Sequence, residues 1–184
     1  RYSMKNMKEL AKKLVDYGMK KGADEVQVSI GNQNKFSVDV RESNVEKLLQ
    51  AESRRLSLKI ILDKKVAYAS SSDFSEQTLF EIMDNGIERA KLSSADDFSG
   101  LPENNEITAD IDALALYDEN IEKMNAEDKI KAIKEIEKIA LADEKVNKSS
   151  GASYNTNVSE TILVNSKGFE GSYKSTGCSA GVYL

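Results

Sequence analysis

The feature that most constrains the fold is a change in the spacing of apolar residues near Gly22. Over residues 4–21 apolar side chains recur every three to four positions, which predicts an amphipathic helix. Beyond Gly22 they alternate with polar residues, first at Val26, Val28 and Ile30. Strict alternation predicts a β-strand with one buried face and one solvated face. The chain therefore enters a sheet directly after its first helix.

Alternating segments then follow one another through short connections. Residues 36–40 repeat the pattern, and residues 45–51 are a candidate third strand. The alternation is clearest over residues 56–62 and continues at residues 66–70. Turns are expected at residues 31–34, 42–44 and 63–64. Short connections between alternating segments predict an antiparallel meander.

Two further helices are predicted from caps and apolar stripes. The first begins at Asp73, whose carboxylate can accept a hydrogen bond from the amide of Glu76, and ends near Leu92. The second begins at Asn125 and carries acidic residues in its first turn, where the helix dipole favours them. Residues 93–124 lie between them as an irregular segment, and a loop of that length is usually functional or packs on a neighbour.

The spacing returns to two in the last part of the chain, which predicts strands near residues 147–156, 158–165 and 169–183. A hairpin turn is expected at residues 165–168. This order of elements predicts the α+β class, with a largely antiparallel twisted sheet and two to three helices packed on one face. Because 184 residues suffice for one such core, residues 1–184 are predicted to form a single domain.

The composition excludes several kinds of site. The sequence contains no histidine, which excludes a Ser-His-Asp triad, a Cys-His dyad and a histidine-ligated zinc site within this chain. The single cysteine, Cys178, cannot form an internal disulfide, and this is typical of a reducing, cytoplasmic compartment. Because Cys178 alternates with apolar neighbours, a buried structural thiol is favoured over a nucleophile. No apolar run approaches the roughly 20 residues that a membrane span needs.

No catalytic constellation emerges from the other candidate residues. The acidic pairs within residues 96–97 and 110–112 lack the spacing of a calcium loop, so solvated loop acids are the favoured interpretation. The serines at residues 70–72 precede a helix, where an anion could bind, but a turn with caps is favoured because no glycine-rich loop accompanies them. A basic stretch within residues 54–65 is favoured as the solvated face of a hairpin.

The order of several short motifs resembles a known family. These motifs are GADEV at residues 22–26, ASSSDFS at 69–75, DDFSGLP at 96–102, LYD at 116–118, VNSKG at 164–168 and YKST at 173–176. In this order and spacing the chain resembles, over essentially its whole length, the N-terminal domain of the TldD/PmbA family, also called the modulator of DNA gyrase family. The serine stretch and the Val-Asn-Ser turn look closer to the PmbA (TldE) branch.

This resemblance implies a cytoplasmic protein longer than this chain, with residues 1–184 as its N-terminal domain. TldD-type subunits are zinc metallopeptidases whose His-Glu-x-x-x-His helix lies C-terminal to this domain. PmbA-type subunits lack the zinc ligands and pair with TldD-type subunits, and the assembly hydrolyses or trims peptides. The N-terminal domain helps to enclose the peptide-binding cavity and contributes to dimer contacts, so an edge strand is expected to hold an extended peptide by strand addition.

No catalytic, cofactor-binding or metal-binding residue carries over to this chain, and zinc is expected only in the C-terminal domain of an active subunit. The positions that transfer are structural and are expected in turns and caps: Ser70, Ser72, Asp73, Asn165 and Gly168. The resemblance further implies a homodimer or a heterodimer with a TldD/PmbA-type subunit and a peptide substrate. No membrane partner is expected, and nucleic acid is disfavoured as a partner.

Two other functions stay open. A standalone module that grips a peptide or protein along a sheet edge would require a native chain that ends near Leu184. Nucleic-acid binding through the basic stretch would give an affinity that falls steeply as salt rises. The net charge of −5 disfavours the second of these functions.

Overall fold

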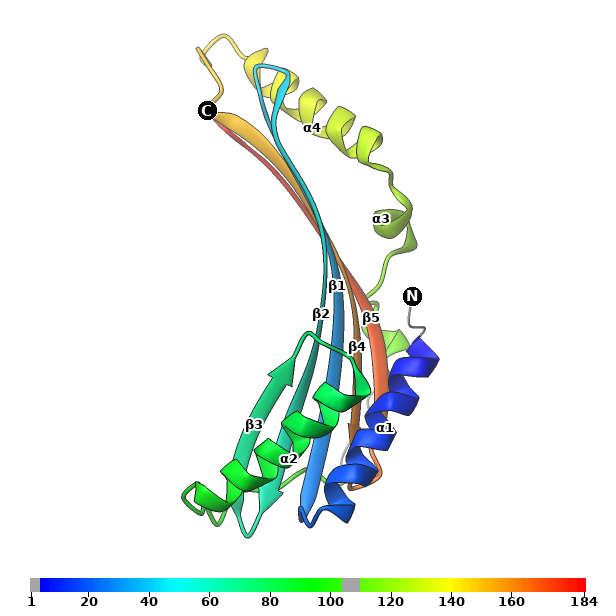
Figure 1. The fold of residues 1–184 in the computed structure, drawn as a ribbon. Coiled ribbons are helices and arrows are strands. Elements are labelled where there is room, and N and C mark those ends of the chain that lie inside the picture. Colours follow the sequence, from blue (N-terminus) through cyan, green and yellow to red (C-terminus); the bar gives the residue numbers. More distant parts are fainter. Residues whose placement is uncertain (1–3, 104–109) are drawn as a thin grey trace. The chain divides into compact units, whose positions relative to one another are not determined.

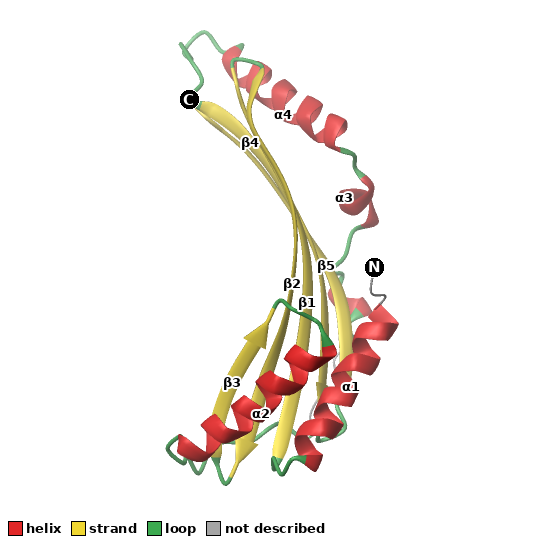
Figure 2. Cartoon of the chain, in the orientation of Figure 1, coloured by secondary structure: helices red, strands yellow, loops and turns green. Residues whose placement is uncertain are grey.

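The computed structural model describes residues 4–103 and 110–184 (Figure 1). Its helices are α1 (Met4–Lys20), α2 (Glu76–Leu92), α3 (Glu119–Lys123) and α4 (Ala126–Leu141), with a short 3₁₀ helix, η2, at Asp112–Leu114. Its strands are β1 (Glu25–Arg41), β2 (Asn44–Leu62), β3 (Lys65–Ser71), β4 (Gly151–Asn165) and β5 (Glu170–Tyr183). They form one sheet in the order β3-β2-β1-β4-β5 (Figure 2). The predicted α+β class is confirmed.

Three strands are longer than the sequence predicts. The interruptions expected at residues 31–34, between residues 51 and 56, and at residue 157 are wrong, because β1, β2 and β4 run through them. In β1 the reason is visible in the pattern of burial. Ile30 and Phe36 are an even number of residues apart and both are buried, so the polar residues between them stay in phase with one extended strand.

Two local predictions also need correction. The N-cap of α2 is Ser75, and the Asp73 carboxylate accepts a hydrogen bond from the amide of Ser75 (2.8 Å), not from that of Glu76. Glu76 instead forms an ion pair with Lys13 of α1 (2.6 Å). The segment at residues 93–124 is not irregular throughout, because η2 and α3 lie within it. Part of that segment, residues 104–109, lies outside the described residues.

The chain divides into two compact units that share the long strands. Unit 1 comprises residues 1–32, 53–111 and 160–173, and unit 2 comprises residues 33–52, 112–159 and 174–184. β1, β2, β4 and β5 therefore each contribute one part to unit 1 and another part to unit 2.

In unit 1, α1 and α2 pack on the sheet around a large apolar core. Its fully buried members include Leu14, Val28, Leu58, Leu79 and Met83. Burying each such side chain contributes roughly 1.5–3 kcal/mol relative to leaving it exposed. This core fixes which face of each strand points inward throughout unit 1.

In unit 2, α4 covers one face of the sheet over a smaller core. The side chains of Val38, Val40 and Ile133 are fully buried there. Glu137 of α4 is also buried, and its carboxylate accepts hydrogen bonds from the amides of Glu42 (3.0 Å) and Ser43 (2.9 Å). Both turn residues have φ in the left-handed region, 49° and 63°. The carboxylate therefore holds a tight β1–β2 turn that has no glycine.

Candidate functional site

The sheet of unit 2 has a face that points away from α4. Along β1 and β4, buried residues such as Phe36 and Thr156 alternate with partly or fully exposed polar residues. Because neighbouring residues of a strand point to opposite faces, these polar side chains share the face opposite α4. We call this surface the open face, defined by Lys35, Ser37, Asn155, Asn157 and Ser179.

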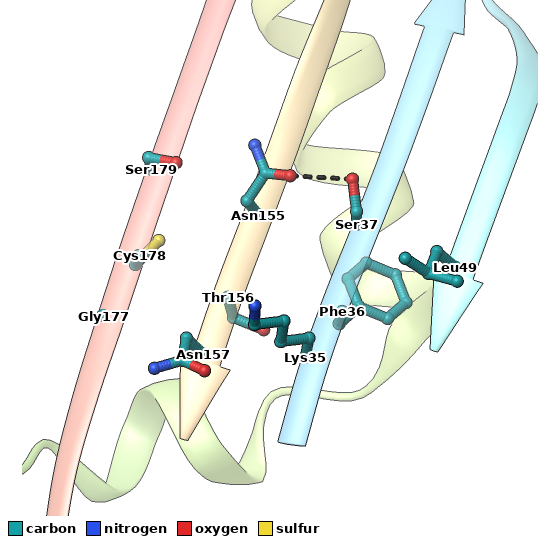
Figure 3. Close-up of a pocket in the computed structure, with 10 residues that line it drawn as sticks. All are labelled: Lys35, Phe36, Ser37, Leu49, Asn155, Thr156, Asn157, Gly177, Cys178 and Ser179. Carbon is teal, nitrogen blue, oxygen red and sulfur yellow. Dashed lines mark hydrogen bonds between the residues drawn. The ribbon is translucent and has the colours of Figure 1, made fainter. Parts of the chain in front are cut away.

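A pocket of about 420 Å³ lies at the open face (Figure 3). It is lined by residues of four strands: Lys35, Phe36, Ser37, Leu49, Asn155, Thr156, Asn157, Gly177, Cys178 and Ser179. All of these residues belong to unit 2. The lining contains no carboxylate and one ammonium group, that of Lys35. The pocket therefore offers a positive charge and several hydrogen-bonding groups beside the exposed apolar side chain of Leu49.

The asparagines of the pocket are only partly satisfied. The Ser37 hydroxyl donates to Oδ1 of Asn155 (2.7 Å), a bond drawn in Figure 3. The side-chain amide of Asn157 donates to the Ser159 hydroxyl (2.9 Å), but Oδ1 of Asn157 is buried and accepts no hydrogen bond from the described residues. A buried acceptor without a donor costs roughly 1–3 kcal/mol, so it needs an explanation.

Cys178 lies at the pocket and is exposed, so the prediction of a buried thiol is wrong. The alternating pattern did place it on a strand, but β5 is an outer strand of the sheet and leaves the thiol uncovered. Its Sγ lies 3.1 Å from the hydroxyl of Tyr154. This hydrogen bond, followed by burial, raises the pKa of Tyr154 to about 12.

Lys129 of α4 is buried behind the same strands. Its ammonium donates to the Thr156 hydroxyl (3.1 Å) and lies 4.8 Å from the centre of the Phe36 ring. Burial lowers the pKa of Lys129, because removal from water disfavours the charged form. The sequence pattern did not single out this residue, since a lysine within an amphipathic helix is ordinarily solvated.

The outer strands of unit 2 differ in what lies beside them. On β5, the amide of Thr176 donates to the carbonyl of Leu116 (2.9 Å), and the Thr176 hydroxyl accepts from the amide of Asp118 (2.9 Å). On β2, β3 pairs with residues 56–62, and within the described chain no strand lies beyond the part of β2 in unit 2. We call residues 44–52 the β2 edge.

The β2 edge is exposed on both faces along its whole length. Its apolar side chains are among the exposed large hydrophobic residues, with Val45 at 42%, Leu48 at 49% and Leu49 at 46% exposure. An edge strand presents unpaired backbone N–H and C=O groups that can pair with another extended chain. The β2 edge therefore has both the backbone groups and the apolar side chains to hold an extended peptide.

The residues singled out from the family resemblance lie elsewhere in unit 1, at the end of β3 and just beyond it, and in the β4–β5 turn. Ser70 lies on β3, where it pairs with Ser57 of β2, and Ser72 is exposed just beyond the end of β3. Hydrogen bonds from the Ser75 amide and from the Thr78 and Ser75 hydroxyls hold the pKa of Asp73 below its usual value. None of the three lines the pocket.

The second turn joins β4 to β5 and contains the other two motif positions. Oδ1 of Asn165 accepts from the amides of Lys167 (2.9 Å) and Phe169 (3.1 Å). Gly168 has a φ of 89°, a conformation that favours glycine because it lacks a side chain. Neither residue lines the pocket in unit 2.

The lysines of the basic stretch, on the β2–β3 hairpin, form hydrogen bonds with other parts of the chain. The ammonium groups of Lys59, Lys64 and Lys65 donate to the backbone carbonyls of Gly100, Ser99 and Lys91, respectively. The guanidinium of Arg54 lies 5.5 Å from the centre of the Phe74 ring. These lysines tie the last turn of α2 and the segment after it to the hairpin, which disfavours a phosphate-binding surface.

Two domain families match this sequence. The family described as PmbA/TldA metallopeptidase domain 1 matches residues 26–94, and the PmbA/TldA metallopeptidase central domain matches residues 119–184. Together these two matches cover more than half of the chain. A curated relative, the metalloprotease PmbA homolog of Haemophilus influenzae, is 27% identical over 163 residues, which is 88% of this chain and 36% of that protein.

Three solved structures are similar to this chain over nearly its whole length. A protein of Bacteroides thetaiotaomicron named a modulator of DNA gyrase has 28% identity and a TM-score of 0.84, over 98% of this chain and 41% of its own. A protein of the same name from Thermotoga maritima, at 19% identity and a TM-score of 0.78, matches 96% of this chain and 39% of its own. TldE of Thermococcus kodakarensis, at 17% identity and a TM-score of 0.77, matches 94% and 38%. The chain thus spans about two fifths of the length of these relatives.

Proposed function

Because the chain belongs to the TldD/PmbA family, we propose that it serves in the proteolysis of peptides, as the N-terminal part of a metallopeptidase subunit or of its non-catalytic partner. In this role the chain helps to enclose the cavity that holds the peptide. The part proposed for this chain is to hold the peptide.

The observation that carries this proposal is the β2 edge. It combines free backbone groups with exposed apolar side chains, and it lies in the same unit as the pocket to which Leu49 contributes. A peptide added along this edge gains backbone hydrogen bonds that do not depend on its sequence. The apolar side chains of the edge, Val45, Leu48 and Leu49, then contact alternate side chains of the peptide.

Zinc is proposed only for the region of an active subunit that lies outside this chain. Among the described residues there is no group of His, Cys, Asp or Glu side chains that could hold a metal ion. The residues in hand therefore do not fit a zinc site, and the proposed role of this chain does not include a metal-dependent step.

The partner is proposed to be a second TldD/PmbA-type subunit, in a homodimer or a heterodimer, and the compartment to be the cytoplasm. No helix in the described part of the chain is long and apolar enough to cross a membrane. One free cysteine and no disulfide are compatible with a reducing compartment.

Paired proline substitutions in the full-length protein test this proposal. Glu46→Pro and Lys47→Pro each remove one backbone N–H, and along a strand neighbouring N–H groups point to opposite sides. One substitution therefore removes an N–H that donates to β1. The other removes an N–H that points away from β1, on the free side of the β2 edge. We expect the variant that keeps the wild-type melting temperature to lose peptide binding, measured by fluorescence anisotropy. Unchanged peptide affinity in that variant contradicts the proposal.

A standalone peptide-binding module remains the second candidate, and the same observation favours it. The β2 edge is built entirely from residues of this chain, so strand addition requires no second domain. The mass of the endogenous protein separates the two candidates, because a mass near that of this chain, 20.3 kDa, supports the module and a much larger mass supports the subunit.

A further inference from the structure

We infer that the pocket on the open face binds the free C-terminal end of a peptide, taking its α-carboxylate at Lys35 and Asn155 and its last amide N–H at Asn157. This inference rests on the proposed function and names the part of the peptide that the pocket recognises. It comes from three groups that share one pocket and whose hydrogen-bonding capacity is left unused by the described residues.

The first group is the ammonium of Lys35. Lys35 is exposed, and its ammonium has no ion pair or hydrogen bond with any described residue. Figure 3 shows its side chain reaching from β1 toward β4, to the region between Asn155 and Asn157. Since the pocket lining contains no carboxylate, this positive charge has no counter-ion in the pocket itself. An anionic ligand therefore complements it.

The second group is the side-chain amide of Asn155. The Ser37 hydroxyl donates to its oxygen, which fixes the carboxamide so that the oxygen points toward β1. The NH₂ of Asn155 is then the end that remains for another partner, and no described residue accepts from it. A carboxylate has two oxygens and only accepts hydrogen bonds, so it can take one from Asn155 and one from Lys35.

The third group, Oδ1 of Asn157, needs a hydrogen-bond donor as its partner. Oδ1 of Asn157 is a buried acceptor without a donor, while its own NH₂ is held by Ser159. A ligand that only accepts hydrogen bonds leaves this oxygen unsatisfied. A ligand that carries an N–H donor close to its carboxylate satisfies this oxygen as well.

The last residue of a peptide has this combination. Its α-carboxylate and its amide nitrogen are bonded to the same Cα atom, so an acceptor pair and a donor lie within one residue. The exposed apolar residue Leu49 lines the same pocket and offers a surface for the side chain of that residue. An anion such as chloride or sulfate lacks the donor, and an internal peptide bond lacks the charge.

The test compares two short peptides of the same sequence, one with a free C-terminal carboxylate and one with a C-terminal amide. Dissociation constants are measured by calorimetry with the full-length protein. We expect the acid to bind about tenfold more tightly than the amide, since a hydrogen bond to a charged group is worth roughly that much. Lys35→Gln should bring the ratio of the two constants close to one. Lys131→Gln, at an exposed lysine of α4 outside both the pocket and the β2 edge, should leave the ratio unchanged.

Asn157→Ala supplies a second and independent readout. We expect this variant to weaken binding of the acid peptide and also to raise the melting temperature of the free protein, because the unsatisfied buried acceptor is gone. A purely structural asparagine would lower the melting temperature instead. A lowered melting temperature together with unchanged affinity therefore counts against the inference.

The outcomes separate this inference from the proposed function. Equal binding of acid and amide by the wild type overturns the inference and leaves the proposed function standing. An amidated peptide that ends in aspartate and binds as tightly as the acid shows that a side-chain carboxylate is recognised, and it overturns the assignment to the chain end. Failure of every peptide to bind overturns the proposed function and the inference with it.

Discussion

Unit 1 and unit 2 share four long strands but use them for different purposes. In unit 1, two helices bury one face of these strands under a large apolar core, and lysines tie the segment after α2 to the β2–β3 hairpin. In unit 2, one helix covers a smaller core, and both the open face and the β2 edge remain exposed. The difference teaches that the burial, and with it the stabilisation, lies mainly in unit 1, which leaves unit 2 free to bind.

The comparison is sharpest within β2, where two leucines have opposite surroundings. Leu58 in unit 1 is 1% exposed and Leu48 in unit 2 is 49% exposed. Leu58→Asp places a charge without a partner in the core and should cost more than about 4 kcal/mol, enough to unfold the domain. Leu48→Asp should cost less than about 0.5 kcal/mol. Denaturant unfolding of both variants checks this, and equal losses would contradict the division between the units.

The next largest effect is expected at Glu137, the buried carboxylate of unit 2 that holds the β1–β2 turn. Glu137→Ala leaves the amides of Glu42 and Ser43 without their acceptor and should cost about 2–3 kcal/mol. The matched control is Glu135→Ala, on the same helix but exposed, which should change stability by less than about 0.5 kcal/mol. If both variants melt like the wild type, the turn does not depend on the carboxylate.

The pKa of Glu137 also predicts how the stability of the protein depends on pH. Burial alone would raise the pKa of Glu137, but hydrogen bonds from Ser43, Ser149 and Glu42 outweigh burial and lower it. The folded protein therefore favours the carboxylate, so its contribution is complete above the ordinary pKa of 4.5 and is lost as the pH falls through the lower folded value. Unfolding free energies of Glu137→Gln should converge with those of the wild type in acid. A difference in unfolding free energy between the two proteins that stays constant at all pH values would contradict this account.

A smaller effect of opposite sign is expected at Lys129. Its ammonium is buried and burial lowers its pKa, so the unfolded chain holds that proton more tightly than the folded chain. Stability should therefore rise with pH between the lowered value and the ordinary value of 10.5. Lys129→Met removes the buried charge and should stabilise unit 2 by about 1 kcal/mol. A destabilised Lys129→Met protein would mean that the contacts with Thr156 and Phe36 outweigh the cost of burial.

The smallest effect is expected at Cys178. The thiol is exposed and its one described contact is with the Tyr154 hydroxyl. Cys178→Ser keeps a donor at that position, so stability should change by less than about 0.5 kcal/mol and any peptidase activity of the full-length protein should be unchanged. Lost hydrolysis by a correctly folded variant would reveal a role for the thiol.

Sequence reasoning performed differently in the two units. The alternation at Leu56, Leu58 and Ile60 predicts their buried face, because a large core enforces one register on every strand. The break expected at residues 31–34 failed because polar residues can remain in an extended strand when the strands on either side stay paired. Turn residues are therefore weaker signals inside a long strand than between two short ones.

The pocket could not be found in the sequence. Lys35, Asn155 and Cys178 lie far apart along the chain and resemble ordinary residues of a solvated strand face. Only the pairing of β1, β4 and β5 brings them together, and only the structure reveals that Oδ1 of Asn157 is buried without a donor. The family resemblance pointed to turn residues of unit 1, which carry the fold and not the pocket.

Hydrogen exchange of the full-length protein, with and without a saturating peptide that has a free C-terminus, tests the central claim most directly. We expect new protection of backbone amides at residues 44–52, while β3 at residues 65–71, an outer strand of unit 1, exchanges as before. Protection of β3 or β5 without any change at residues 44–52, under conditions where the peptide is bound, would contradict the claim that unit 2 binds peptides along the β2 edge.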